Sequence, residues 1–137
     1  MTSEQMDALV DQHFRFEAED DVDGVMQTLL EGAVHEVIPS PVGATTDPSG
    51  QRLYYELLFA SITGERVEPL RRYYGENFLV DESLWHGRID DGRPFLLDGR
   101  SGPVSFRLLH LFEFEGGKIS REQVWCDLAA IQRQLDA

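Results

Sequence analysis

The sequence predicts an α+β fold in one domain spanning residues 1–137. Apolar residues recur at helical spacing through most of the first 62 positions, whereas residues 66–126 alternate between polar and apolar side chains. Helices that precede a run of strands, rather than alternating with them, favour the α+β class. The length of 137 residues fits a single domain.

The first predicted helix covers residues 4–18. Thr2 and Gln5 precede and open it at the spacing of a capping box. One face of this helix carries an apolar stripe that includes a single histidine: Met6, Leu9, Val10, His13 and Phe16. We therefore expect this face to be buried, with the imidazole of His13 in or beside the core.

A second helix, a short strand and a third helix follow. The second helix starts at Asp20 or Asp21 and extends its apolar face to Leu30. Residues 33–38 have a strand-like pattern, after which prolines and glycines break the chain into a loop. The third helix covers residues 48–62, with an aspartate as its N-cap and a proline at its first position.

The rest of the chain predicts a meander of strands and one closing helix. A turn-rich segment at 90–102 and a Gly-Gly turn separate the later strands. The final helix covers residues 127–135. The four strands are predicted at residues 66–75, 78–89, 103–115 and 118–126.

The composition argues against several classes of partner. The net charge is −13, and residues 1–50 hold eleven acidic residues against the single base Arg15. Phosphate backbones and anionic lipids would be repelled, so we expect neither nucleic acid nor a membrane as partner. Cys126 is the one cysteine, which fits a cytoplasmic protein without disulfides. Because no Cys/His spacing typical of zinc occurs, we predict no metal and no cofactor.

The order of elements and two C-terminal segments resemble a known family. The first segment is VSFRLLHLFEFEGGKI at residues 104–119. The second is the step Val124-Trp125-Cys126-Asp127, which precedes a helix containing Leu and Gln. These features resemble the nuclear transport factor 2-like superfamily, and within it the SnoaL-like polyketide cyclases.

The resemblance implies a specific architecture. A curved antiparallel sheet forms a cone-shaped barrel around the long first helix and leaves an interior pocket. The family places isomerases, epoxide hydrolases, dehydratases, cyclases and binding proteins on this scaffold, so it specifies the fold better than the chemistry. It also implies a homodimer through the open face of the sheet, where Arg71, Arg72, Tyr73 and Tyr74 would lie.

Comparison with the ketosteroid isomerases of this superfamily indicates pocket positions. His13 falls where that enzyme has its oxyanion-hole tyrosine, and His110 falls at its protonated aspartate. The general-base aspartate corresponds to Val37, which cannot accept a proton. The resemblance therefore implies the pocket positions but not the isomerase mechanism.

His110 is the strongest catalytic candidate, because it interrupts a strand face that is otherwise apolar and aromatic. His13 is either a hydrogen-bonded core residue or a pocket acid, base or donor. Of the neighbours Asp81 and Glu82, only one can point inward; Glu82 beside His110 would form a carboxylate–histidine pair, or else pair with an arginine. Asp127 is either the N-cap of the last helix or a catalytic group.

Aromatic and apolar residues could form the wall of the pocket. Such a wall suits a flat hydrophobic ligand, which we expect to be neutral or weakly anionic. The sequence predicts a cofactor-independent proton-transfer enzyme, a cyclase, isomerase or dehydratase acting on a polycyclic or aromatic ketone. The alternative is a non-catalytic ligand-binding or dimerisation module. The expected wall residues are Tyr54, Leu58, Trp85, Phe106, Phe112, Trp125 and His35.

Overall fold

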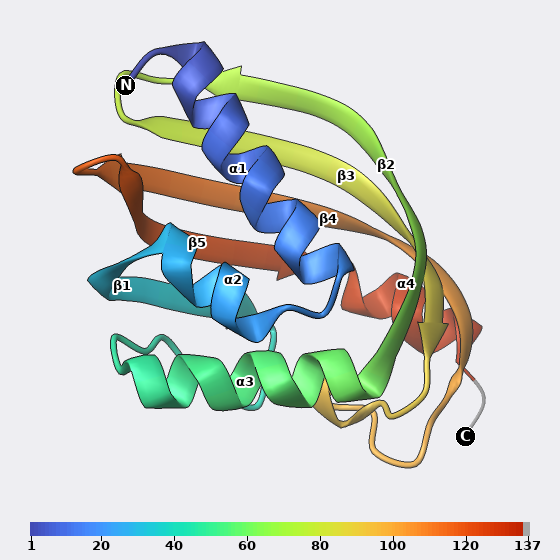
Figure 1. Cartoon of the computed structure of the whole chain (residues 1–137). Helices are drawn as coiled ribbons and strands as arrows, with labels where there is room; N and C mark the ends of the chain where they lie inside the picture. Colours follow the sequence, from blue (N-terminus) through green and yellow to red (C-terminus); the bar gives the residue numbers. More distant parts are fainter. Residues whose placement is uncertain (136–137) are drawn as a thin grey trace.

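Five strands form one strongly curved sheet that remains open at both edges (Figure 1). The computed structural model describes residues 1–135. The spatial order of the strands is β1-β5-β4-β3-β2. The strands are β1 (Leu29–Ile38), β2 (Ile62–Tyr74), β3 (Phe78–Ile89), β4 (Gly102–Glu115) and β5 (Lys118–Cys126).

The sheet is mixed rather than wholly antiparallel, which corrects the prediction. The pairs β2–β3, β3–β4 and β4–β5 are antiparallel, as a meander with short turns requires. Strand β1 pairs in parallel with β5. Because β1 is followed by a loop and a helix rather than a hairpin, no turn signal in the sequence defines its direction.

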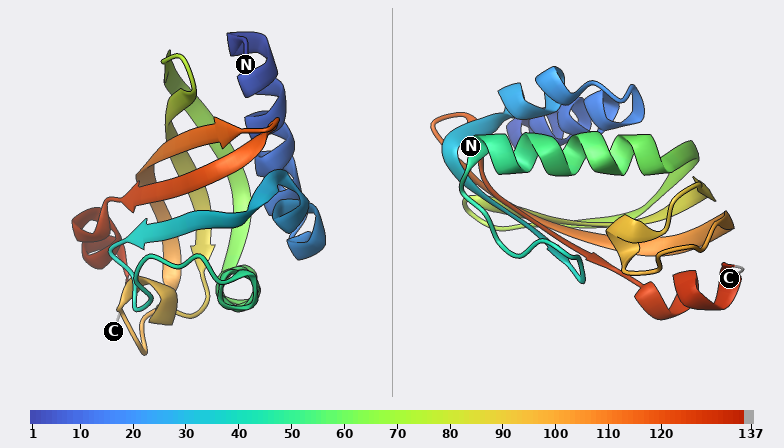
Figure 2. Two further views of the ribbon diagram at one scale, coloured as in Figure 1. Left: turned by 90° about the vertical axis from the view of Figure 1, so that its left-hand side faces the viewer. Right: turned by 90° about the horizontal axis from the view of Figure 1, so that it is seen from below.

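Three helices cover the concave face of the sheet, and a fourth packs against β4 at its end (Figures 1 and 2). The predicted capping box is confirmed: the Thr2 hydroxyl accepts from the Gln5 amide, and the Gln5 side chain accepts from the Thr2 amide. The helices are α1 (Ser3–Ala18), α2 (Val22–Thr28), α3 (Pro48–Ser61) and α4 (Leu128–Gln134), with a short 3-10 turn at Arg93–Phe95.

The boundary between α2 and β1 lies earlier than the apolar pattern predicts. The helix ends at Thr28, and Leu29 already belongs to the strand, with its side chain buried in the core. The pairing register of β1 shifts between Leu29 and Val34, where Gly32 has a φ of 80°. A leucine pair that fits either a helix or a strand left this boundary undetermined in the sequence.

Two apolar clusters stabilise the two ends of the fold. The first lies between the helices and the sheet and contains Met6, Val10 and Phe112. The second joins the far ends of β3 and β4 to α4 and contains Ile89, Phe106 and Ile131. The space between these clusters is only partly filled, and it holds the interior pocket.

Among the described residues, no helix combines the length and the hydropathy that crossing a membrane requires.

Candidate functional site

A cavity of about 510 Å³ opens between the C-terminal half of α1, the end of α3 and the strands β2, β3 and β4. Its wall is largely apolar at Leu58 and Trp85, as predicted, and it contains His110. The other lining residues are Asp11, Phe14, Arg15, Glu17, Ala18, Asp20, Phe59, Ile62, Gly64, Glu65, Arg66, Val67, Pro69, Arg72, Asp81, Ser83 and Leu108.

Asp81 and His110 form a pair of polar residues in the wall of this cavity. They stand directly opposite each other on β3 and β4, so both side chains lie on the same face of the sheet. Asp81 is 2% exposed and His110 is 5% exposed. Within residues 1–135, neither Asp81 Oδ1 nor His110 Nδ1 has a hydrogen-bond partner. Buried polar atoms are rarely left in this state, so this pair is the candidate functional site of the cavity.

Neighbouring side chains fix the orientation of both residues. Arg72 Nε donates to Asp81 Oδ2 over 2.8 Å, which holds the carboxylate in place and leaves Oδ1 free. The His110 ring stacks on Phe112, with the ring centroids 5.4 Å apart, and meets the edge of Phe14 at 4.9 Å. The pair therefore has fixed geometry with unused hydrogen-bonding capacity.

Asp81, rather than Glu82, supplies the carboxylate beside His110, which corrects the predicted carboxylate–histidine pair. Glu82 lies on the opposite face of β3, where its carboxylate is 3.0 Å from Arg71 Nε and 3.9 Å from Arg107 Nε. The alternative ion-pair interpretation of Glu82 is therefore confirmed.

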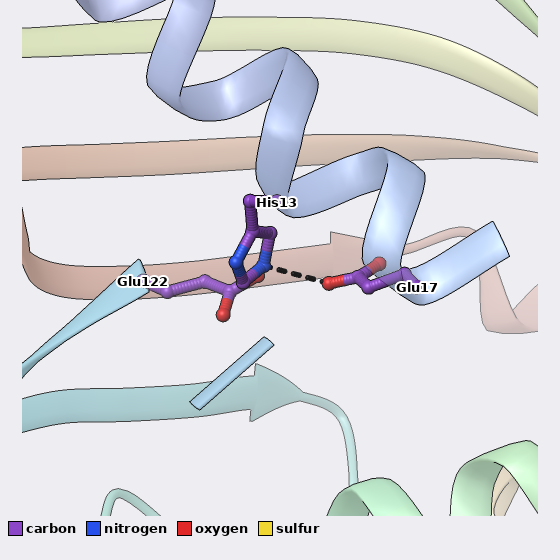
Figure 3. A group of neighbouring side chains, drawn as sticks. All are labelled: His13, Glu17 and Glu122. Atoms are coloured by element: carbon purple, nitrogen blue, oxygen red, sulfur yellow. Dashed lines mark hydrogen bonds and ion pairs between the residues drawn. The ribbon is translucent and has the colours of Figure 1, made fainter. Parts of the chain in front are cut away.

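His13 belongs to a second polar cluster, together with Glu17 and Glu122 (Figure 3). Its Nε2 is 2.7 Å from Glu17 Oε1 and 3.0 Å from Glu122 Oε2. Its Nδ1 is 2.7 Å from the Thr28 hydroxyl, which itself donates to the Val25 carbonyl. Since every partner of the ring is an acceptor, both nitrogens must donate, and His13 is an imidazolium.

The electrostatics of this cluster agree with its geometry. Burial alone lowers the pKa of His13, but the carboxylates of Glu122 and Glu17 outweigh it and raise the pKa to about 10. Burial would likewise raise the pKa of Glu122, but His13 outweighs it and holds that pKa well below its usual range. The Tyr55 hydroxyl donates to the second oxygen of Glu122. The cluster is therefore a hydrogen-bonded ion network in which one imidazolium faces two carboxylates.

Within the described residues, His13, Glu17 and Glu122 are the group that could hold a metal ion, because their ligand atoms all lie within 4.8 Å of one another. A metal would need a lone pair on His13 Nε2. In this structure that nitrogen is hydrogen-bonded to Glu122 and forms an ion pair with Glu17, so the three side chains already satisfy one another.

His13 does not line the cavity, so its position corresponds to the hydrogen-bonded core residue of the two alternatives. It is fully buried, and it reaches the cavity only through Glu17, whose side chain is 24% exposed. Asp127 is also outside the cavity lining; it is the N-cap of α4, and its carboxylate accepts from the Ala130 amide over 3.1 Å.

Several predicted wall residues also lie elsewhere. Phe106 and Phe112 fill the two apolar clusters, and Trp125 points away from the helices on the outer face of the sheet. The rings of Tyr54 and His35 pack together with centroids 5.4 Å apart. The five predicted residues absent from the cavity lining are Tyr54, Phe106, Phe112, Trp125 and His35.

Four residues of the two polar clusters were missed or left undecided by the sequence analysis. Asp81 was weighed against Glu82, and Arg72 was assigned to a dimer interface. Glu17 has a usable signal, because it follows His13 by four residues and so shares its helix face. Glu122 has no such signal in the sequence. Strict alternation would place it on the opposite face from Ile119, but a register shift in the β4–β5 pairing turns both side chains into the core.

The open curved sheet with helices in its concavity is the fold of ketosteroid isomerase-like proteins. The family model for the SnoaL-like domain matches residues 10–122. The chain therefore belongs to the SnoaL-like family. No protein of curated function matches the sequence.

Three solved structures illustrate the likeness. A candidate polyketide cyclase from Silicibacter sp. is 15% identical with a TM-score of 0.82, and 100% of this chain and 99% of that chain are covered. A protein of ketosteroid isomerase-like fold from Catenulispora acidiphila, solved with trimethylamine, is 13% identical with a TM-score of 0.75. The match covers 92% of this chain and 90% of that chain. An epoxide hydrolase of M. tuberculosis is 15% identical with a TM-score of 0.69, and the match covers 94% of this chain and 87% of that chain. At these identities the likeness shows the fold alone.

Proposed function

We propose that the protein is a cofactor-independent proton-transfer enzyme acting on a small, largely apolar carbonyl compound. The observation that carries this proposal is the Asp81–His110 pair, two buried residues of a largely apolar cavity wall that each carry one polar atom without a partner in the described part of the chain. A substrate that donates a proton to one residue and accepts a hydrogen bond from the other satisfies both.

The reaction follows from the two side chains. Asp81 Oδ1 removes a proton from the carbon next to the carbonyl group, and the electron pair of that C–H bond moves onto the carbonyl oxygen. An N–H of His110 donates to this oxygen and stabilises the enolate. The proton then returns from Asp81 to carbon, at the same or a conjugated position, which gives exchange or isomerisation.

The surroundings suit this chemistry. Arg72 compensates the charge of Asp81 through Oδ2 and leaves Oδ1 to act as the base. Leu58, Phe59 and Trp85 provide apolar wall, which excludes water from the reacting atoms. A cavity of about 510 Å³ is in the range of pockets that hold a bicyclic or tricyclic compound.

The test is proton exchange at carbon. 2-Tetralone, a bicyclic aromatic ketone, is incubated with the protein in heavy water, and loss of the α-proton signal is followed by NMR. We expect faster exchange than in buffer, and we expect Asp81→Asn to slow the catalysed exchange about 100-fold or more, the usual contribution of a general base.

Glu82→Gln is the matched control, because Glu82 is adjacent on the same strand but faces away from the cavity. It should exchange the ketone at the wild-type rate. Equal rates for wild type and Asp81→Asn would contradict the proposal. A ketone that binds in the cavity without any accelerated exchange would favour the non-catalytic binding module instead.

We also propose that the outer face of the sheet forms a homodimer contact. Large apolar side chains are exposed there on neighbouring strands, including Tyr73, Leu109 and Trp125. Arg71 belongs to this face, whereas Arg72 and Tyr74 turn inward to α1, where both contact Asp7. Sedimentation equilibrium tests the proposal: the wild type should be a dimer, and Leu109→Glu a monomer.

A further inference from the structure

The two polar clusters leave negative charge uncompensated around the cavity. Arg72 contacts three carboxylates at 2.7 to 2.8 Å, those of Asp7, Asp11 and Asp81. The protonated His13 likewise faces two carboxylates, Glu17 and Glu122. Arg72 is one cation among three carboxylates, and His13 is one cation between two, so each cluster carries a net negative charge.

The remaining arginines of the cavity wall are engaged elsewhere. The guanidinium of Arg15 lies 5.9 Å from the ring centroid of Phe16. Arg66 is 3.8 Å from Glu68, and its side chain is 59% exposed. In the described part of the chain, neither arginine forms an ion pair with a carboxylate of the cavity. A cationic ligand would therefore find carboxylates in the wall that these two arginines do not pair.

Glu17 is the carboxylate best placed to receive a cation from a ligand. Its Oε1 contacts His13, while Oε2 has no ion-pair or hydrogen-bond partner within residues 1–135. Phe14 lies one turn earlier on α1, and both residues line the cavity, as do Phe59 and Trp85. A carboxylate beside aromatic rings is a favourable environment for an alkylammonium group.

Burial separates the roles of Glu17 and Asp81. Glu17 retains contact with solvent, whereas Asp81 is 2% exposed and already paired with Arg72. An ammonium group loses less of its hydration beside Glu17 than beside Asp81. Asp81 Oδ1, buried and without a partner in the described part of the chain, is a second observation that points to a ligand in this cavity.

We propose that the cavity binds a ligand with an apolar body and a protonated amine, and that Glu17 binds the amine. The inference rests on the proposed function, because it names the substrate class of the same cavity, with Asp81 and His110 left to the reacting carbon and oxygen. It revises the sequence-based expectation of a neutral or weakly anionic ligand. His13 then acts as a positioning residue that aims the carboxylate of Glu17.

The test compares two ligands of one skeleton. Isothermal titration calorimetry measures the dissociation constants of 2-aminotetralin, which is protonated at neutral pH, and of its neutral analogue 2-methyltetralin. We expect the amine to bind wild type about tenfold more tightly or better, as a charged hydrogen bond predicts. Glu17→Gln should remove this preference and leave the affinity for the neutral analogue unchanged.

The control is Glu82→Gln, which removes one acidic charge outside the cavity and should retain the full preference. Equal affinities of wild type for the two ligands would overturn the inference. So would a preference that survives Glu17→Gln and disappears in Asp81→Asn, or a Glu17→Gln variant that loses both ligands. Binding is independent of ketone exchange, so failure of this inference and failure of the proposed reaction are distinguishable.

Discussion

The two polar clusters of this fold are built from similar side chains but differ in how completely they satisfy one another. The imidazole of His13 uses both nitrogens on Glu17, Glu122 and Thr28. The imidazole of His110 on β4 has no partner for its Nδ1, and Asp81 on β3 has none for its Oδ1 in the described part of the chain. A histidine and carboxylates in a core therefore identify a site only where their hydrogen bonding is incomplete.

The difference has an energetic meaning. A buried network whose members are hydrogen-bonded to one another resists change, because removing one member leaves an unpaired charge in the core. An incompletely bonded pair lowers the stability of the empty protein and recovers that cost when a ligand binds. The His13 cluster should therefore dominate stability, and the Asp81–His110 pair should dominate activity.

Replacing His13 by Leu should produce the largest effect on stability. The substitution leaves the carboxylates of Glu17 and Glu122 together without their cation, and breaking a buried ion pair in this way costs about 3 to 5 kcal/mol. Urea unfolding followed by circular dichroism measures the loss. His86→Leu is the control, because His86 lies on the outer face of the sheet.

If His13→Leu fails to fold, the double variant His13→Leu/Glu122→Gln provides the test. It removes the buried charge together with its partner, so it should be more stable than the single variant by about 1 to 3 kcal/mol, the range of coupling between contacting residues. A cost for His13→Leu below about 1 kcal/mol would show that the cluster is not an ion network.

The pH dependence of stability should come next in size. The pKa of His13 rises from 6.5 to about 10 on folding, so its contribution is complete below pH 6.5 and is lost as the pH rises toward 10. The free energy of unfolding should fall by roughly 2 to 4 kcal/mol over this interval. The pKa of Glu122 is lowered instead, so its contribution is lost as the pH falls below its unfolded value of 4.5.

Denaturant titrations between pH 4 and pH 10 measure this profile, with an optimum expected between the unfolded pKa values of Glu122 and His13. His35 also lies 3.7 Å from Glu122, but burial lowers its pKa, so it weakens stability below pH 6.5 and does not contribute to the alkaline limb. A wild-type profile that stays flat up to pH 9 would show that His13 is neutral in the fold.

The comparison also explains how far the sequence could predict the site. The helices and the meander follow from periodicity, and His110 was found because it interrupts an apolar strand face. Asp81 could not be separated from Glu82, because both faces of β3 mix polar and apolar residues, with Phe78 on the outer face and Trp85 on the inner one. Alternation decides a strand's orientation only when one of its faces is clearly polar.

Irregularities in the sheet account for the other misassignments. A register shift between Pro69 and Arg71 places Arg72 opposite Asp81, on the inner face of the sheet. Alternation of residue types along β2 does not predict which face Arg72 occupies. A second shift in the β4–β5 pairing turns Glu122 into the core. Each bulge reverses the side-chain alternation along its strand, and neither leaves a mark in the pattern of residue types.

Replacing His110 by Leu should produce the smallest effect on stability, and it completes the comparison with the same substitution at His13. Deleting the ring removes the unpartnered Nδ1, which favours the variant, but it also removes the contacts with Phe14 and Phe112. Each of these terms is on the order of 1 kcal/mol, so the free energy of unfolding should change by about 1 kcal/mol or less. Ketone exchange should nevertheless fall about 100-fold, because the enolate loses its hydrogen-bond donor.

The matched pair separates the two clusters in a way that neither variant does alone. His13→Leu should lower stability while any folded fraction keeps Asp81 and His110 in place, whereas His110→Leu should lower exchange in a protein of unchanged stability. If His110→Leu instead unfolds the protein as readily as His13→Leu, both histidines are structural. In that case the missing hydrogen bond at Nδ1 marks an imperfection of packing, and Asp81 alone would have to carry the proton.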